Sequence, residues 1–151
     1  AGGKVTGTAA AGKHEQLPKL GVDHCIDYTR EDFELRAREL TGGRGVELIL
    51  DAVGGESFKK SWRALAPTGR LGMFGLSAAA TGKQRSWLAF ARAAFSMPWF
   101  QFTPLALMND NKAAFGVNVG HLWGEIERIT GWMEELLRLY REGAIRAVIA
   151  E

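Results

Sequence analysis

The chain has 151 residues, of which 46% are hydrophobic and 24% are charged. This length fits one domain with a sizeable core, and the composition excludes a disordered chain. The net charge of +2, spread along the chain, argues against nucleic acid as a partner. The single cysteine, Cys25, excludes an internal disulfide and a cysteine zinc cluster, so we expect a reducing, cytoplasmic setting. The three histidines, His14, His24 and His121, are far apart and lack ligand spacing, so we expect no bound metal.

Short apolar segments alternate with helical patterns through the first half of the chain. We predict strands at 4–9, 24–28, 46–51 and 69–75, and helices at 12–20, 32–40 and 57–65. Pro18 weakens the first of these helices because it lacks a backbone donor. The alternation predicts an α/β fold, a parallel sheet with helices on both faces, because parallel neighbours require crossover connections. Ligands of such sheets bind beyond the carboxyl ends of the strands.

The segment 77–112 interrupts this alternation as a hydrophobic insertion. It contains a predicted helix at 84–96 and an aromatic, proline-bearing run at 97–104. Large apolar side chains in such an insertion cover a partner subunit, a substrate pocket or a lipid surface. A strand at 113–119 and the longest helix, from 120 or 121 to 142, follow it, and the tail at 144–150 resembles another strand.

Six motifs resemble, in order and spacing, the medium-chain dehydrogenase/reductase superfamily: Gly7–His14, Gly21–Tyr28, Thr41–Val46, Leu50–Gly55, Leu65–Leu71 and Phe74–Gly75. Within this superfamily the chain resembles the zinc-free quinone oxidoreductases, which include zeta-crystallin-like proteins. It is most similar to their vesicle amine transport protein-like members, because a long insertion precedes the motif at 113–122.

The resemblance implies a Rossmann-type cofactor domain that is partial over residues 1–151. In the family, a first strand and a glycine-rich turn precede the strand at 4–9, and a catalytic domain flanks the cofactor domain on both sides. We therefore expect the first strand and the turn to be missing, and 144–151 to begin the return to the catalytic domain. An isolated chain of this kind should be inactive.

The resemblance places the adenosine end of the cofactor after the strand at 4–9. The segment that begins with Thr8 and Ala9 holds no acid that would select NAD, and Lys13 follows it. In the family, a lysine at this position and a tyrosine matching Tyr28 contact the 2′-phosphate, so the resemblance implies NADPH. The alternatives are a solvated lysine and a half-buried strand tyrosine.

The nicotinamide end is expected beyond the later strands. The family passes its backbone close to the cofactor at Ala52, Val53 and Gly54. Phe74, Gly75 and Ser77 match positions beside the nicotinamide-side ribose, and the backbone of 115–118, with Phe115 and Val117, would meet the carboxamide. The alternatives are that Gly54 is a plain turn glycine, that Phe74 is a core residue, and that 115–118 belongs to a hydrophobic edge strand. Asp51, at a strand end, could orient a loop by hydrogen bonding.

The implied activity is metal-free hydride transfer from NADPH to a quinone or an enone, and no catalytic side chain is nominated. The resemblance also implies a homodimer through strand 113–119, whose apolar edge needs a partner. A second hypothesis is a non-enzymatic interaction or membrane-associated module that uses the aromatic insertion at 87–102. A methyltransferase-like domain ranks below both, because the acid expected at its second strand end is absent.

Overall fold

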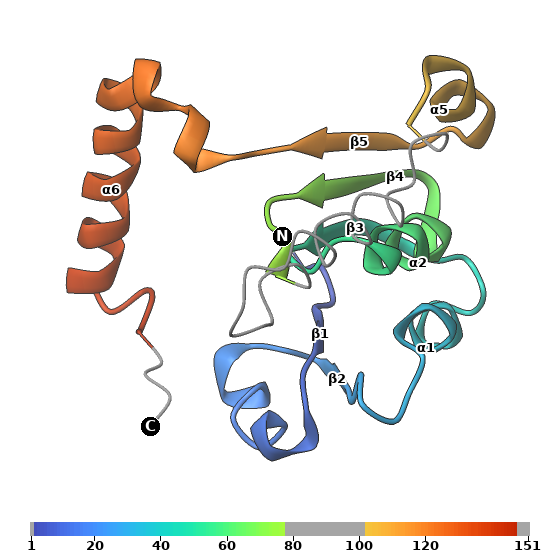
Figure 1. The fold of residues 1–151 in the computed structure, drawn as a ribbon. Helices are drawn as coiled ribbons and strands as arrows, with labels where there is room; N and C mark the ends of the chain where they lie inside the picture. The colour runs from blue at the N-terminus through green and yellow to red at the C-terminus, as the bar shows by residue number, and fades with distance from the viewer. Residues whose placement is uncertain (1, 78–101, 148–151) are drawn as a thin grey trace, which may run out of the picture. The chain divides into compact units, whose positions relative to one another are not determined.

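The computed structural model describes residues 2–77 and 102–147, which belong to two compact units, Ala1–Val117 and Asn118–Glu151 (Figure 1). The predicted helix at 84–96 and most of the insertion at 77–112 lie outside the described residues. So does the end of the predicted tail strand, and the described residues 144–147 form no strand.

The first unit opens with two short parallel strands, β1 (Thr6–Thr8) and β2 (His24–Ile26). Both strands were predicted, and both are shorter than expected. β2 ends because the Asp27 carboxylate accepts hydrogen bonds from the backbone N–H and the hydroxyl of Thr29, at 3.0 and 2.6 Å, which turns the chain.

The segment between β1 and β2 differs from the prediction. Two short 3-10 turns, η1 (Ala11–Lys13) and η2 (Pro18–Leu20), stand where a helix was expected over 12–20. That prediction was wrong because Pro18 cannot donate to a carbonyl of the preceding turn, so it begins a new turn. Gly21, at φ 86°, then ends the second turn.

A second sheet of three parallel strands follows, in the order β3 (Val46–Asp51), β4 (Leu65–Met73) and β5 (Ala113–Gly116) (Figure 1). β3 matches its predicted bounds. β4 begins at Leu65 instead of 69, because the chain becomes extended at Leu65 directly after α2. The strand then contains an irregularity in its register with β3, and Thr68 is left-handed there, at φ 68°. β5 ends before 119, because Asn118 turns the chain by accepting a hydrogen bond from Gly120 N–H.

α1 (Phe33–Leu40) connects β2 to β3, and α2 (Glu56–Ala64) connects β3 to β4; both lie close to the predicted 32–40 and 57–65. The Asp32 side chain caps α1 by accepting from the backbone N–H of Glu34 at 2.9 Å. The same carboxylate pairs with Lys60 of α2, and Arg63 of α2 pairs with Glu34 at 2.7 Å. These two ion pairs fix α1 against α2.

The core of the first unit lies between α2 and one face of the three-stranded sheet. Trp62, Leu65 and Leu71 are at most 3% exposed and form its centre. The Phe102 ring packs edge-on against Trp62, with 5.3 Å between the ring centroids. Phe102 thus supports the core. A further helix that was not predicted, α5 (Pro104–Asp110), follows it and packs Leu107 on the same core.

The second unit contains η3 (Val119–His121), η4 (Trp123–Glu125) and α6 (Ile126–Arg141). The long helix was expected to begin at 120 or 121. It begins later because the Asn118 side chain caps a separate 3-10 turn by accepting from the Gly120 N–H, and Gly120 and Gly124 lower helix propensity before Ile126. One side of α6 is apolar and exposed: Ile126, Trp132, Met133, Leu136, Leu137 and Tyr140.

Candidate functional site

The carboxyl ends of the three strands in the second sheet are tied together. Phe74 donates its backbone N–H to the Asp51 carbonyl at 3.2 Å, and Ser77 donates to the Ala52 carbonyl at 3.0 Å. The Val117 N–H reaches the Met73 carbonyl at 2.9 Å. We call the residues that meet here, 51–54, 74–77 and 115–117, the carboxyl-end cradle.

Two glycines permit this close approach. Gly54 has φ 83°, and a Cβ built on it would lie 2.6 Å from Cδ2 of Leu76. A Cβ on Gly75 would lie 2.7 Å from the Ala52 carbonyl oxygen. Both distances are shorter than any ordinary contact. A larger residue at Gly75 would meet backbone and force the two turns apart, whereas at Gly54 it would displace the Leu76 side chain and strain the left-handed backbone.

The cradle presents apolar side chains to solvent. Val53, Phe74, Phe115 and Val117 are 43–55% exposed although they are large and hydrophobic. Eight of the predicted site residues lie in the cradle: Ala52, Val53, Gly54, Phe74, Gly75, Ser77, Phe115 and Val117. An open apolar surface beside closely approached backbone is suited to a flat ring and a sugar.

The side chain of Asp51 is the buried part of the cradle and is 4% exposed. Its Oδ1 accepts from the backbone N–H groups of Val53 and Gly54, at 2.8 and 3.2 Å. Its Oδ2 accepts from the hydroxyls of Ser57 and Ser61, each at 2.7 Å. Four donors therefore satisfy a buried carboxylate at the point where β3 turns into α2.

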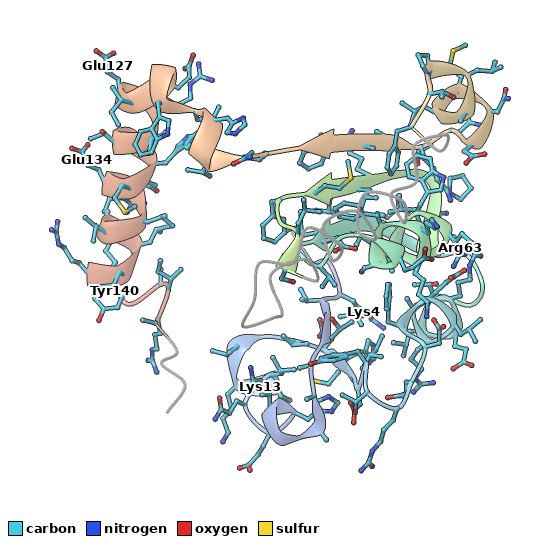
Figure 2. The ribbon with its side chains drawn as sticks, viewed as in Figure 1. Lys4, Lys13, Arg63, Glu127, Glu134 and Tyr140 are labelled. Atoms are coloured by element: carbon cyan, nitrogen blue, oxygen red, sulfur yellow. The ribbon has the colours of Figure 1, made fainter. Side chains whose placement is uncertain are left out.

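The other four predicted residues lie around the ends of β1 and β2. The Ala9 N–H donates to the Ile26 carbonyl at 3.0 Å, which joins the two strand ends just after Thr8. His14 Nε2 lies 2.9 Å from the Ala9 carbonyl oxygen, so the unassigned histidine holds this turn. Lys13 is exposed on η1 (Figure 2). The expected helix N-terminus beside it is absent, because η1 spans only three residues.

Tyr28 is 60% exposed and directly follows the buried Asp27, which is 6% exposed. The Thr29 hydroxyl and N–H lower the pKa of Asp27, with a further contribution from Arg30. Sequence analysis gave Asp27 no role. The sequence pattern that could have indicated this role is Asp-x-Thr, because an aspartate side chain commonly accepts a hydrogen bond from the backbone N–H two residues later and so forms a turn. Asp27 thereby fixes the backbone that carries Tyr28.

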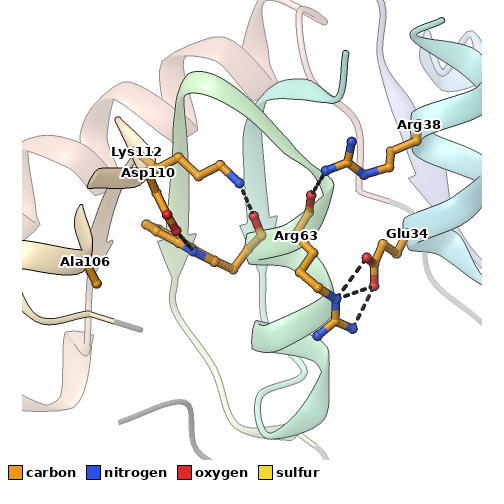
Figure 3. A pocket seen from close by; sticks show the side chains of 7 residues that line it. Glu34, Arg38, Arg63, Ala106, Asp110 and Lys112 are labelled. Atoms are coloured by element: carbon orange, nitrogen blue, oxygen red, sulfur yellow. Dashed lines mark hydrogen bonds and ion pairs between the residues drawn. The ribbon is translucent and has the colours of Figure 1, made fainter. Parts of the chain in front are cut away.

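A pocket of about 460 Å³ opens at the end of the three-stranded sheet that is opposite to the cradle (Figure 3). It lies near the amino ends of β4 and β5, because Trp62 and Lys112 precede these strands. Burial lowers the pKa of Lys112, which donates to the Trp62 carbonyl at 2.8 Å. Asp110 accepts from the Trp62 indole at 2.9 Å. None of the predicted site residues lines this pocket, whose polar groups serve the packing of α2.

No three His, Cys, Asp or Glu side chains in the described ranges 2–77 and 102–147 converge as metal ligands would. Among the helices of these same ranges, none has the length and apolar character needed to cross a membrane.

Parallel strands joined by helices, with a cradle at their carboxyl ends, define an α/β protein of the Rossmann type. Residues 20–151 match the family model described as zinc-binding dehydrogenase. The chain therefore belongs to the zinc-binding dehydrogenase family of the medium-chain dehydrogenase/reductase superfamily, as its motifs indicated.

Curated relatives include the human synaptic vesicle membrane protein VAT-1 homolog, which is 36% identical over 142 residues. That match covers 94% of this chain and 35% of the relative. The VAT-1 protein of Tetronarce californica is 33% identical, with coverages of 94% and 36%. A 2-haloacrylate reductase from Burkholderia is 39% identical over 75 residues, 49% of this chain and 22% of the relative. The chain spans about a third of the length of the VAT-1 relatives.

Solved structures share the fold. A mycobacterial protein complexed with NADPH has a TM-score of 0.69 at 27% identity, covering 97% of this chain and 41% of that protein. The nucleotide-binding subdomain of an enoylreductase domain from Mycobacterium tuberculosis has a TM-score of 0.68 at 24% identity, with coverages of 97% and 73%. A 2-haloacrylate reductase has a TM-score of 0.69 at 24% identity, with coverages of 99% and 42%.

Proposed function

We propose that this chain is part of the cofactor domain of an NADPH-dependent oxidoreductase that reduces a quinone or an enone without zinc. The observation that carries this proposal is the carboxyl-end cradle, which brings together eight predicted cofactor residues from three strand ends. The family membership and the NADPH complex of a relative at 27% identity support the same cofactor.

The cradle fits the nicotinamide half of a dinucleotide. Gly54 and Gly75 leave the backbone of both turns open to close approach, since neither carries a Cβ. The exposed side chains of Val53, Phe74 and Phe115 would cover the faces of the ring and the ribose. When bound, NADPH would supply the hydride, while these residues hold and orient it and exclude water.

The ends of β1 and β2 would hold the adenosine half. The exposed Lys13 forms no ion pair with the described acidic residues, so its ammonium is available to a 2′-phosphate. Tyr28 is exposed and would lie against the same phosphate. Thr8 and Ala9 offer no acid that would repel it.

Among the described strands, β1 pairs only with β2 and β3 pairs only with β4. We propose that a strand outside this chain pairs with β1 and β3 and leads into the glycine-rich turn. In this arrangement 77–112 is an insertion, 144–151 leads to the catalytic domain, and the isolated chain does not turn over substrate.

The experiment that tests the function is a titration of the full-length protein with NADPH and with NADH, followed by tryptophan fluorescence. The proposal expects saturable binding, tighter for NADPH, and NADPH oxidation on addition of a quinone or an enone. Chelator treatment should leave the rate unchanged. An absence of binding to either dinucleotide would refute the proposal, and loss of activity on metal removal would refute its zinc-free form.

We also propose a homodimer through β5, in a cytoplasmic protein. β5 lies at the end of the described sheet and pairs only with β4 there (Figure 1). An edge strand of this kind pairs readily with a second copy of itself. Sedimentation of the full-length protein tests this, and a monomer at all concentrations would contradict it.

The VAT-1 relatives are named as synaptic vesicle membrane proteins, which favours a second candidate function, a membrane-associated interaction module. The aromatic segment 87–102 would be its working surface, and all of it except Phe102 lies outside the described residues. Liposome binding that Trp99→Ala and Phe100→Ala abolish, in a protein that binds no dinucleotide, would favour this alternative.

A further inference from the structure

The buried carboxylate of Asp51 lies where β3 ends, and it is bonded to the first turns of α2. A carboxylate loses its hydration on burial, and this cost is offset only when hydrogen bonds replace the lost water. Asp51 is 4% exposed, and all four groups that contact it are donors: two backbone N–H groups of the following turn and two hydroxyls of α2.

These four contacts connect two different parts of the structure. Ser57 and Ser61 are four residues apart, so their hydroxyls lie on one face of α2, and both bond to Oδ2. The N–H groups of Val53 and Gly54 bond to Oδ1. The carboxylate also lies at the start of α2, where the helix dipole favours negative charge. Asp51 therefore connects a rigid helix to the turn that passes through the cradle.

The two N–H groups are held inward by these bonds. The turn thus offers a ligand its Cα surface and the Val53 side chain, while its amides are already used. The same turn supports the next one, because the Ala52 carbonyl accepts from Ser77 and Gly54 packs against Leu76. If the turn moves, both sides of the cradle move with it.

We propose that Asp51 is a positioning residue. By bonding to Ser57 and Ser61 of α2, it fixes the position of the 52–54 turn of the cradle relative to the nicotinamide half of the cofactor. This inference rests on the proposed function, since it assigns the cradle to a dinucleotide. Asp51 itself does not touch the cofactor. Its effect is to hold the 52–54 turn where a ring can stack against it.

The test compares Asp51→Ala with Asp110→Ala in the full-length protein. Both substitutions remove a carboxylate that accepts hydrogen bonds, but Asp110 bonds to the Trp62 indole at the opposite edge of the sheet. Asp51→Ala should raise the dissociation constant and the KM for NADPH about tenfold, the change expected when contacts equivalent to about one good hydrogen bond are lost. It should also accelerate amide hydrogen exchange at Val53 and Gly54. Asp110→Ala should change neither quantity.

Asp51→Asn should restore most of the affinity, because its side-chain oxygen can still accept from both turn amides. If Asp51→Ala does not fold, the double variant Ser57→Ala and Ser61→Ala removes the helix contacts and leaves the amide contacts. It should raise the KM for NADPH more than it lowers kcat.

Three results would overturn the inference: unchanged exchange at Val53 and Gly54, unchanged NADPH affinity despite faster exchange, or an equal loss of affinity in Asp110→Ala. A wild-type protein that binds no dinucleotide would instead refute the proposed function, while the exchange rates would still report whether Asp51 holds the turn.

Discussion

The substitution Gly75→Ala tests the close contact between the two turns of the cradle. The new Cβ would lie 2.7 Å from the Ala52 carbonyl oxygen and 3.2 Å from the Ala52 Cα, both of which are backbone atoms that cannot rotate away. An ordinary C···O contact is about 3.3 Å, so the turns must separate by about 0.6 Å.

Two hydrogen bonds flank this contact, Phe74 to Asp51 at 3.2 Å and Ser77 to Ala52 at 3.0 Å. A separation of this size stretches both beyond good geometry. Each bond contributes about 1 kcal/mol, so we expect Gly75→Ala to lower the free energy of unfolding by about 2 kcal/mol. We also expect the NADPH dissociation constant to rise about tenfold, because the ring would lose its aligned surface.

Urea denaturation and a fluorescence titration of the full-length protein measure the two effects. Gly131→Ala is the matched control, because nothing lies within 4 Å of its Cβ. Gly131 lies inside α6, where alanine is favoured by about 0.5–1 kcal/mol, so this control should be neutral or stabilising. If Gly75→Ala retains the stability and affinity of the wild type, the contact between the turns is not as described.

Three further predictions concern other parts of the chain. Lys13→Ala should weaken NADPH binding about tenfold at low salt and leave NADH binding unchanged. The control Lys19→Ala should change the binding of neither dinucleotide. Equal weakening of NADPH and NADH binding by Lys13→Ala in titrations would contradict the phosphate contact. Asp32→Ala should lower the free energy of unfolding by about 1 kcal/mol at neutral pH. The hydrogen bond from Lys60 lowers the pKa of Asp32, so this contribution is present above the unfolded pKa of about 3.9 and is lost as the pH falls through the lower folded value. A difference from wild type that persists undiminished at about pH 2 in urea denaturation would disprove it. Trp62→Ala should cost about 3–5 kcal/mol in the same assay, and a loss below about 1 kcal/mol would contradict its place in the core.

Much of the fold could be predicted because hydrophobic periodicity records burial directly. The nearly continuous apolar run at Val46–Asp51 predicted a strand of a parallel sheet buried on both faces. β3 has these bounds and is parallel to β4, but Leu48 and Leu50 are 55% and 63% exposed in the structure, so the burial of both faces was not found. The helix predicted at 32–40 is α1, whose cap is the Asp32 that opens the predicted range. Both elements are determined by neighbouring residues, an apolar run for β3 and a capping residue for α1, and these can be read directly from the sequence.

Other elements depend on competing local signals. The helix expected at 12–20 is two 3-10 turns, because the proline outweighs the weak helical pattern around it. α5 was missed although Thr103 and Pro104 form a helix-start signal, because the surrounding aromatic residues favoured an irregular insertion. Recognition of the Thr103 cap would have predicted α5, and more weight on Pro18 would have corrected the helix at 12–20.

The cradle could be predicted only in part. Its residues follow from the rule that ligands bind at the carboxyl ends of parallel strands. The contact of Gly75 with Ala52 depends on the register of β3 against β4, which pairs Asp51 with Met73. An irregularity in that pairing, between Val46 and Leu48, sets this register and leaves no mark in the sequence pattern. The donors that surround Asp51 follow from the same geometry.

The most direct test of the cofactor assignment is a crystal structure of the full-length protein grown with NADPH. We predict that the nicotinamide half lies against residues 52–54 and 74–77, with the ammonium of Lys13 at the 2′-phosphate. A dinucleotide seated instead in the pocket beside Trp62 and Lys112 would contradict the assignment.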